Sequence, residues 1–252
     1  MSHHKLEVRD LHFSYPDKYE AVKNISFTIH HGESVGIIGA NGAGKSTLLM
    51  LLMGVLFPDD GEVLVGDIHV TKKTLPMIRQ RLGMVFQDPN DQLFMTTVYD
   101  DVAFGPRNYK LDEKEVEIQV AKALKLVGIS HLKDRAPFKL SGGEKRSAAI
   151  ASVLSMQPDV LIMDEPTAAL DPKSRRRVMS LLKRFEHTKI ITSHDLDMVL
   201  ETCKRVIVIK DGKVAADGIT SEILTNVRLL DDCGLEMPLS LQNCPICGAS
   251  KE

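Results

Sequence analysis

A glycine-rich segment directly after a short apolar run limits the folds open to this chain. Residues 34–38 read Ser-Val-Gly-Ile-Ile, which favours a buried parallel strand. Residues 39–46 then read Gly-Ala-Asn-Gly-Ala-Gly-Lys-Ser, and apolar spacing predicts a helix over 46–54. A strand, a glycine loop and a helix in this order predict a phosphate-binding loop in a parallel α/β sheet.

The rest of the chain supports such a sheet with a helical segment inserted into it. Alternating or apolar runs predict strands over 5–15, 25–29, 62–65 and 82–86. Helices are expected over 97–104, 112–127, with Gly128 as its C-cap, and 141–156. From residue 160, strands (160–163, 189–192, 205–209) alternate with helices (172–185, 195–201). This alternation predicts a doubly wound parallel sheet, with residues 89–157 inserted between its halves.

Composition excludes several other classes. With 252 residues, 43% hydrophobic and 26% charged, the chain can build a core, and its net charge of −2 gives no general attraction to nucleic acid. The polar N-terminus lacks a secretory signal, and the longest apolar run, 48–57, is half of the ~20 residues that cross a bilayer. Any membrane role is therefore expected to depend on a partner. Four cysteines, all in the last fifth, favour reduced thiols in the cytoplasm.

The glycine loop is suited to holding a nucleotide. Its backbone N–H groups can surround phosphate oxygens, and the following helix points its positive end at them. Lys45 is expected to reach the β- and γ-phosphates, and Ser46 to ligate Mg²⁺. The alternative, a chance glycine-rich turn, fits the flanking strand and helix less well. The predicted nucleotide-binding residues here are Gly39, Ala40, Asn41, Gly42, Ala43, Gly44, Lys45, Ser46 and Thr47.

A second apolar strand, 160–163, ends in two carboxylates. Asp164 is suited to holding Mg²⁺, usually through water, and Glu165 to polarising the attacking water as a general base. The alternative is a solvated acidic turn after a strand. A phosphate loop elsewhere in the chain makes the functional interpretation the stronger one.

The segment Ser141-Gly142-Gly143-Glu144 opens the helix expected over 141–156. Ser-x-x-Glu predicts a capping box, which satisfies the free N–H groups of the first turn. The same hydroxyl and amides are also suited to a γ-phosphate, since a helix N-terminus binds anions. Both interpretations can hold in turn, with the cap closed when nucleotide is absent.

Several short motifs follow one another along residues 13–195. They are Phe13-Ser14-Tyr15, the glycine loop, Gln87, Leu140-Ser141-Gly142-Gly143, Asp164-Glu165, Ala169-Leu170-Asp171 and Ser193-His194-Asp195. In this order they resemble an ABC transporter ATP-binding subunit over roughly residues 4–225. The resemblance implies an α/β P-loop NTPase of ABC type, with a RecA-like parallel-sheet core, an antiparallel β subdomain and an α-helical subdomain at about 89–157. It implies an ATPase domain over 1–227 and a C-terminal tail over 228–252.

The resemblance also assigns roles to single residues. It implies that Tyr15 stacks on adenine, that His194 contacts the γ-phosphate, and that Gln87 touches the metal and senses a membrane partner. Asp171 is expected at the seam of a dimer. Ser141, Gly142 and Gly143 are expected to serve the ATP held by the opposite subunit. ATP and Mg²⁺ are the implied cofactors, with Ser46, Gln87 and Asp164 toward the metal.

The sequence departs from the family pattern at three places. Glu144 stands where glutamine is most frequent, and Ser147 and Ala148 replace residues that are often arginine and valine. The family tolerates the first change, whereas the sequence gives no account of the other two.

Residues 85–94, continuing to 100–108, resemble the energy-coupling-factor branch, whose importers take up cobalt, nickel or vitamins. The resemblance implies a transmembrane coupling subunit and a substrate-binding membrane subunit as partners. It also implies a peripheral place on the cytoplasmic membrane face. Asp88, Asp91 and Gln92 are expected to line the groove that receives helices of the coupling subunit; the alternative is a solvated loop. Cobalt or nickel is favoured over vitamins, because metal systems commonly use one ATPase as a homodimer and vitamin systems pair two.

Two other classes fit less well. Soluble ABC proteins of translation or repair usually carry two fused ATPase halves or a long coiled-coil insertion, and neither pattern occurs here. A nucleotide-binding regulator without turnover would not need Glu165 and His194.

The C-terminal Cys244-Pro245-Ile246-Cys247 resembles one knuckle of a zinc ribbon. Zn²⁺ would need two further ligands, from Cys203, Cys233 or a second subunit. The alternative is a frayed tail with reduced thiols. His3 and His4 are expected to be surface residues.

Overall fold

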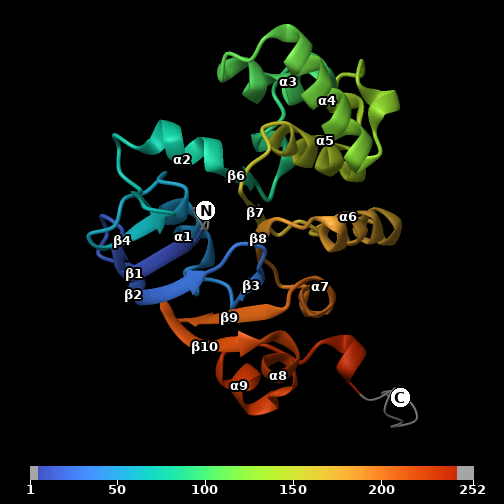
Figure 1. Cartoon of the computed structure of the whole chain (residues 1–252). Coiled ribbons are helices and arrows are strands. Elements are labelled where there is room, and N and C mark those ends of the chain that lie inside the picture. The colour runs from blue at the N-terminus through green and yellow to red at the C-terminus, as the bar shows by residue number, and fades with distance from the viewer. Residues whose placement is uncertain (1–4, 243–252) are drawn as a thin grey trace. The chain divides into compact units, whose positions relative to one another are not determined.

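The computed structural model describes residues 5–242 (Figure 1). The chain divides into two compact units, each described here by itself. The first unit comprises residues 1–78 and 187–252, and the second comprises residues 79–186. Helix α2 (Leu75–Arg81) runs through the boundary between them in sequence.

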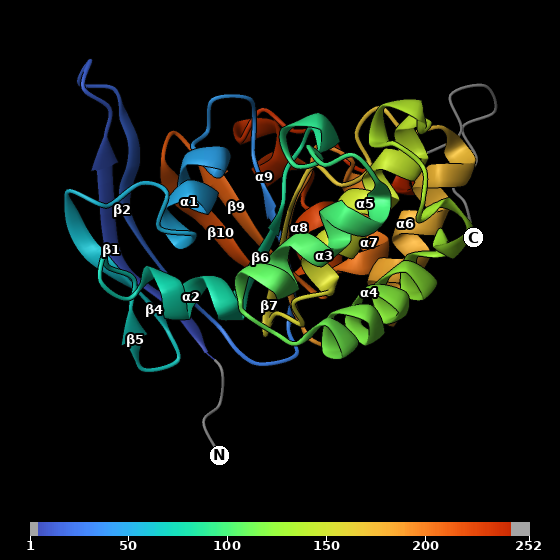
Figure 2. The same ribbon diagram turned by 90° about the horizontal axis from the view of Figure 1, so that it is seen from above.

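The first unit contains an antiparallel sheet near its N-terminus (Figure 2). Its strands are β1 (Leu6–Ser14), β2 (Glu20–Ile29), β4 (Asp60–Val65) and β5 (Ile68–His69), in the order β2-β1-β4-β5. Leu6, Val8 and Leu11 of β1 are buried. The antiparallel subdomain implied by the resemblance is thereby confirmed.

The same unit contains parallel strands that carry the glycine loop. Strand β3 (Ser34–Ile38) lies between β8 (Thr188–Thr192) and β9 (Arg205–Lys210) and runs parallel to both. All residues of β3 are buried, as expected for a central parallel strand. Strand β10 (Lys213–Ile219) pairs antiparallel with β9. The helices of this unit are α1 (Lys45–Leu52), α7 (Leu196–Thr202), α8 (Thr220–Thr225) and α9 (Val227–Asp232).

The second unit combines a parallel strand pair with a group of helices. Strand β6 (Leu82–Val85) pairs with β7 (Val160–Asp164). Helices α3 (Val98–Asn108), α4 (Glu113–Val127) and α5 (Gly142–Leu154) pack against one another (Figures 1 and 2). Helix α6 (Pro172–Arg184) follows β7. Short 3₁₀ turns are η1 (Pro89–Asp91), η2 (Ser130–Leu132) and η3 (Pro137–Lys139).

Helix α3 differs from the prediction, because it continues to Asn108 instead of ending at 104. Pro106 lacks an N–H, so the carbonyl of Val102 loses its helical donor. The hydroxyl of Ser155 donates to that carbonyl instead, at 2.8 Å. This substitute bond lets the helix run through the proline.

Residues 228–242, which belong to the segment expected as a C-terminal tail, carry regular structure. Helix α9 buries Leu230, and Cys233 after it is buried too. The carboxylate of Asp197 accepts the backbone N–H groups of Leu239, at 3.1 Å, and Ser240, at 2.9 Å, in η4 (Leu239–Leu241). Over residues 5–242, none of the helices is long and apolar enough to cross a membrane.

Candidate nucleotide and magnesium site

The glycine loop of the first unit joins the buried end of β3 to α1. At two positions of this loop, neighbouring backbone leaves no room for a side chain, so glycine is required. A Cβ on Gly39 would lie 2.2 Å from the carbonyl oxygen of Ile209, and one on Gly44 would lie 2.3 Å from that of Ala21. Gly44 also has a φ of 106°, which side-chain-bearing residues rarely adopt. The loop is therefore pressed against neighbouring backbone, and it leads directly into the N-terminus of α1, the end of a helix that binds anions.

Lys45 folds over this loop. Its Nζ donates to the carbonyl oxygens of Gly39, at 2.8 Å, and Ala40, at 3.0 Å. It also lies 3.5 Å from Nε2 of His194, which follows β8. The structure thus brings together the lysine and the histidine that the sequence assigns to the γ-phosphate. Ser46, the predicted metal ligand, is exposed beside them.

Two tyrosines reach toward the loop from the end of β1. The hydroxyl of Tyr15 lies 3.0 Å from Oγ1 of Thr47, and its ring packs edge-on against Phe13, with centroids 5.0 Å apart. Tyr19 donates its hydroxyl to the carbonyl oxygen of Gly42 at 2.9 Å. The sequence did not predict this second contact, although an aromatic residue four positions after Tyr15 was the available signal.

The second unit brings the acidic strand end and the glutamine loop to one edge. Strands β6 and β7 are parallel, with Val85 opposite Met163, so the segments after them leave on the same side. Gln87 follows β6 and is exposed, whereas Glu165 follows β7 and is only 8% exposed. Glu165 has a φ of 46°, and a non-glycine residue held in this region is typical of functional sites.

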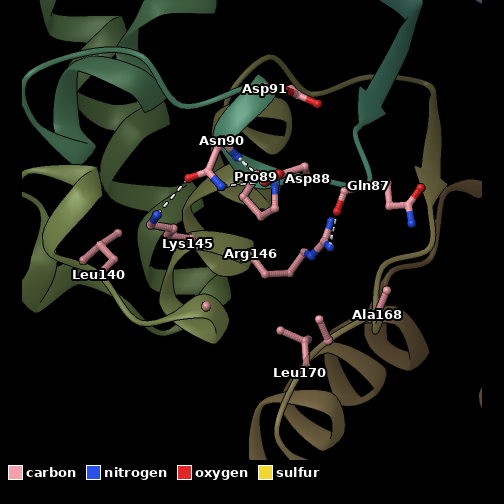
Figure 3. Close-up of a pocket in the computed structure, with 12 residues that line it drawn as sticks. Gln87, Asp88, Pro89, Asn90, Asp91, Leu140, Lys145, Arg146, Ala168 and Leu170 are labelled. Carbon is pink, nitrogen blue, oxygen red and sulfur yellow. Dashed lines mark hydrogen bonds between the residues drawn. The ribbon is translucent and has the colours of Figure 1, made fainter.

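Arg146 of α5 lies beside these residues, and the sequence did not single it out. Its Nη1 donates to the carbonyl oxygen of Phe86 at 2.7 Å. Its Nη2 donates to the carbonyl oxygen of Gln87 at 2.5 Å (Figure 3). Burial lowers the pKa of Arg146, while the carboxylates of Asp88, Asp164 and Glu165 oppose this effect. A charged residue on a helix is usually exposed, which is why its pattern gave no signal.

The capping box predicted at the start of α5 is confirmed. The hydroxyl of Ser141 accepts the N–H of Glu144, and Glu144 Oε2 accepts both the N–H and the hydroxyl of Ser141 at 2.8 Å. These bonds, the backbone one first, lower the pKa of Glu144.

The first turn of α5 also meets the first turn of α6. A Cβ on Gly143 would lie 2.1 Å from Oγ of Ser174, whereas one on Gly142 would meet nothing described within 4 Å. Asp171 caps α6 by accepting the N–H groups of Lys173, at 2.9 Å, and Ser174, at 3.1 Å.

A groove of about 500 Å³ lies beside the glutamine loop (Figure 3). Its lining comes from the loop, the start of α5 and the segment after β7: Gln87, Asp88, Pro89, Asn90, Asp91, Leu140, Gly142, Lys145, Arg146, Ala168, Ala169 and Leu170. Asp88 caps η1 by accepting the N–H and the side-chain amide of Asn90, both at 2.8 Å.

Gln92 differs from the prediction, because it does not line this groove. Its side-chain amide turns toward α5 and donates to the carbonyl oxygen of Ala149 at 2.7 Å and to Ser152 Oγ at 2.9 Å. Its Oε1 accepts the N–H of Phe86 at 3.2 Å. Gln92 therefore fastens the loop to α5.

The predicted zinc ligands Cys244 and Cys247, like His3 and His4, lie outside the described residues. Burial raises the pKa of the thiols of Cys203 and Cys233, which disfavours the thiolate that a metal requires.

Comparison with known proteins now gives a consistent picture. Residues 22–168 match the ABC transporter family. The chain is 61% identical over 248 residues to a Geobacter sulfurreducens protein described as an ABC transporter ATP-binding protein, covering 98% of this chain and 100% of that one. It is 44% identical over 238 residues to EcfA of Methanothermobacter thermautotrophicus, an energy-coupling factor transporter ATP-binding protein, covering 92% and 76%.

Solved structures agree with these relatives. CbiO1 from Clostridium perfringens, part of the ABC transporter complex CbiONQ, has a TM-score of 0.82 at 42% identity, covering 91% of this chain and 94% of that one. The dimeric ATP-binding cassette MJ0796, bound to ADP and Pi, has a TM-score of 0.77 at 28% identity, covering 85% and 98%.

Proposed function

The chain belongs to the ABC transporter ATP-binding family, as an ATPase of the energy-coupling factor type, and on this premise we propose that it hydrolyses ATP as a dimer to drive import through membrane subunits. The observation that carries this proposal is the glycine loop, whose backbone shape is fixed by Gly39 and Gly44. Its amides and the N-terminus of α1 fit a phosphate chain.

The first unit supplies the groups that hold the nucleotide. Lys45 exchanges its bonds to the loop carbonyls for the β- and γ-phosphates, and His194 is within reach of the same ammonium. The ring of Tyr15 stacks on the adenine. Backbone amides and one cation together neutralise a charged ligand that a single side chain could not.

The second unit supplies the carboxylates for hydrolysis. Gln87 and Asp164 of this unit and Ser46 of the first unit would each offer an oxygen ligand to Mg²⁺, which would supply charge neutralisation at the phosphates. Glu165 accepts a proton from the attacking water, and its burial keeps the carboxylate in one orientation. Ser141, Gly142 and Gly143 offer their helix N-terminus to the ATP of the opposite subunit, with Asp171 at the seam between subunits.

The substitution Glu165→Gln tests this proposal. It preserves shape and ATP binding but removes the base, so kcat should fall ~10²–10⁴-fold. ATP-bound dimers should accumulate on size-exclusion chromatography, since they no longer turn over. Near-wild-type ATPase activity in Glu165→Gln would remove the base assignment and with it the proposed mechanism.

The groove beside Gln87 supports a membrane partner as the recipient of the energy. Asp88 and Asp91 place two carboxylates on the loop side of the groove, opposite Lys145 and Arg146 of α5, and these carboxylates suit a cationic helix end of the coupling subunit. Asp88→Asn with Asp91→Asn removes both charges while keeping the cap on η1, since asparagine caps as well as aspartate does. Copurification with the membrane subunits should weaken in the double variant. The ATPase activity of the isolated protein should stay unchanged in Asp91→Asn alone, because the carboxylate of Asp88 also acts on the charge of Arg146. Unchanged complex yield and uptake would contradict this docking site.

Cobalt or nickel is the proposed cargo, with vitamins as the alternative. The naming of CbiO1 as part of CbiONQ supports a transporter complex for a relative at 42% identity. Uptake of radioactive ⁵⁷Co or ⁶³Ni into cells that express the complete transporter should require Lys45. Uptake of a vitamin instead, under the same requirement, would reverse the choice of cargo and keep the ATPase.

We also propose that the protein acts at the cytoplasmic face of the membrane. In addition, we propose that Cys244 and Cys247 are ligands of a Zn²⁺ ion. Zinc content of the full chain, measured with and without Cys244→Ser and Cys247→Ser, tests the latter. A zinc content that both forms share would contradict it.

A further inference from the structure

We propose that Arg146 is a positioning residue that fixes the backbone of Gln87 to the signature helix α5. The inference rests on the proposed function for the role of Gln87 but on contacts of the second unit for the link itself. Helix α5 then carries the Ser141–Gly143 turn at its N-terminus. About one helical turn later, through Arg146, the same helix fixes the position of the Gln87 backbone. Neither the sequence motifs nor the family resemblance assigns this role to Arg146.

The contact has the geometry of a rigid fork. One guanidinium nitrogen bonds the carbonyl oxygen of Phe86 and the other bonds that of Gln87, at 2.7 and 2.5 Å. A planar guanidinium can hold two acceptors at fixed spacing, which an ammonium on a flexible stem cannot. The two peptide groups that flank the Cα of Gln87 are therefore both held by Arg146, although the side chains of Phe86 and Gln87 are exposed.

Arg146 is also unusually buried for a cation. Its side chain is 2% exposed, and its Nε has no hydrogen-bond partner among the described residues. Burying a guanidinium is costly unless nearby charges and acceptors compensate. Here the two carbonyls and the carboxylates of Asp88, Asp164 and Glu165 do so. Arg146 thus lies between the glutamine loop and the acidic end of β7, and both segments compensate its charge. A side chain that only filled space there would not need to be charged.

Two further contacts fasten the same loop to α5. Nζ of Lys145 donates to Oδ1 of Asn90 at 2.8 Å, and the side chain of Gln92 bonds Ala149 and Ser152. These attach the far part of the loop, whereas Arg146 alone holds Gln87 itself among the side-chain contacts described. A displacement of α5 is therefore expected to move the whole segment 86–92.

The test compares Arg146→Gln and Arg146→Lys with a control at the C-cap of the same helix, Ser155→Ala. Ser155 is buried and donates to Val102, so its loss removes a buried hydrogen bond far along α5 from the loop. Hydrogen exchange of the backbone amides of residues 86–88, 90 and 91, measured in nucleotide-free protein, tests this link directly. Exchange should accelerate about tenfold or more in Arg146→Gln, less in Arg146→Lys, and remain at the wild-type rate in Ser155→Ala.

Steady-state ATPase kinetics measures whether loss of this link weakens the use of Mg²⁺. In Arg146→Gln the KM for ATP should stay within about twofold, while kcat falls and the half-saturating Mg²⁺ concentration rises ~10-fold or more, as for loss of a residue that orients a metal ligand. Arg146→Lys should restore part of both.

Each outcome decides the inference. Unchanged exchange in both Arg146 variants, or equal changes in Ser155→Ala, overturns it whatever the ATPase activity. An unchanged Mg²⁺ requirement with accelerated exchange overturns the metal role. If the wild-type protein hydrolyses no ATP while exchange responds as expected, the proposed function fails and the link between Arg146 and Gln87 stands.

Discussion

The N-termini of α1 and α5, which we propose bind ATP phosphates from one subunit and the next, differ in what occupies them. Within the described residues, α1 follows Gly44 with no side-chain cap and no acidic residue in its first turn. By contrast, α5 is closed by the capping box of Ser141 and Glu144, which places a carboxylate at the helix end. One helix end is open to an anion, and the other already holds one.

This difference teaches how a composite site can stay inactive until it is assembled. A cap of this kind contributes about 1 kcal/mol, whereas hydrogen bonds to a charged phosphate contribute about 1.5–3 kcal/mol each. The phosphate can therefore replace the cap on α5, but only when a second subunit presents it. The open end of α1 needs no such exchange and should bind nucleotide in the monomer.

The largest effects are expected from substitutions that disable the N-termini of α1 and α5 one at a time. Lys45→Ala should abolish nucleotide binding at the loop, and Ser141→Arg should block the closed end while leaving monomeric ATP binding intact. Each should lower the ATPase rate ~10²–10³-fold, as for the loss of a principal electrostatic contact. ATPase assays and nucleotide titration of each purified variant measure both effects.

A mixture of these two variants supplies the control. A mixed dimer contains one composite site with an intact loop and an intact signature turn, so activity should return. If mixed dimers form and remain as inactive as either parent, the two helix ends do not serve one nucleotide across the dimer.

A medium effect is expected at the glycines of the closed end. Gly143→Ala places a methyl group 2.1 Å from Ser174 Oγ and should lower the free energy of unfolding by about 1–3 kcal/mol. Gly142→Ala meets open space and should be neutral or stabilise by up to about 1 kcal/mol, because alanine favours helix. Urea unfolding of both variants measures the contrast. Equal losses would show that space at Gly143 is not limiting, and Ser174→Gly should relieve the Gly143→Ala defect.

The smallest effect concerns the charge of the cap. Since the folded-state pKa of Glu144 is lowered, its stabilisation is complete above the unfolded pKa of about 4.3 and is lost as the pH falls through the folded value. Glu144→Gln should lower the free energy of unfolding at pH 7 by about 0.3–1 kcal/mol. The difference from wild type should vanish at the acidic end, which thermal unfolding across pH 2–7 would follow. A constant difference at all pH values would exclude the carboxylate charge as its cause.

Local signals in the sequence were sufficient for the fold and for most of the site's location. The glycine loop, the acidic strand end and the capping box depend on neighbouring residues, so their patterns survive in the sequence. The contacts of other side chains depend on which distant backbone groups they meet after folding. This is the case for Arg146, Tyr19 and Gln92, whose partners are not specified by neighbouring residues in the sequence. The continuation of α3 past Pro106 is similar, because its donor, Ser155, comes from another helix.

The order of the strands has a consequence for how the protein is made. Strand β3, which carries the glycine loop, pairs with β8 and β9, and β8 begins about 150 residues after β3 ends. At a synthesis rate of ~5–20 residues per second, the loop's strand waits roughly 8–30 s for its first sheet neighbour. All of residues 79–186 are made during that interval. We therefore expect the second unit to fold first during translation, and nucleotide to protect the nascent chain only after β9 has left the ribosome.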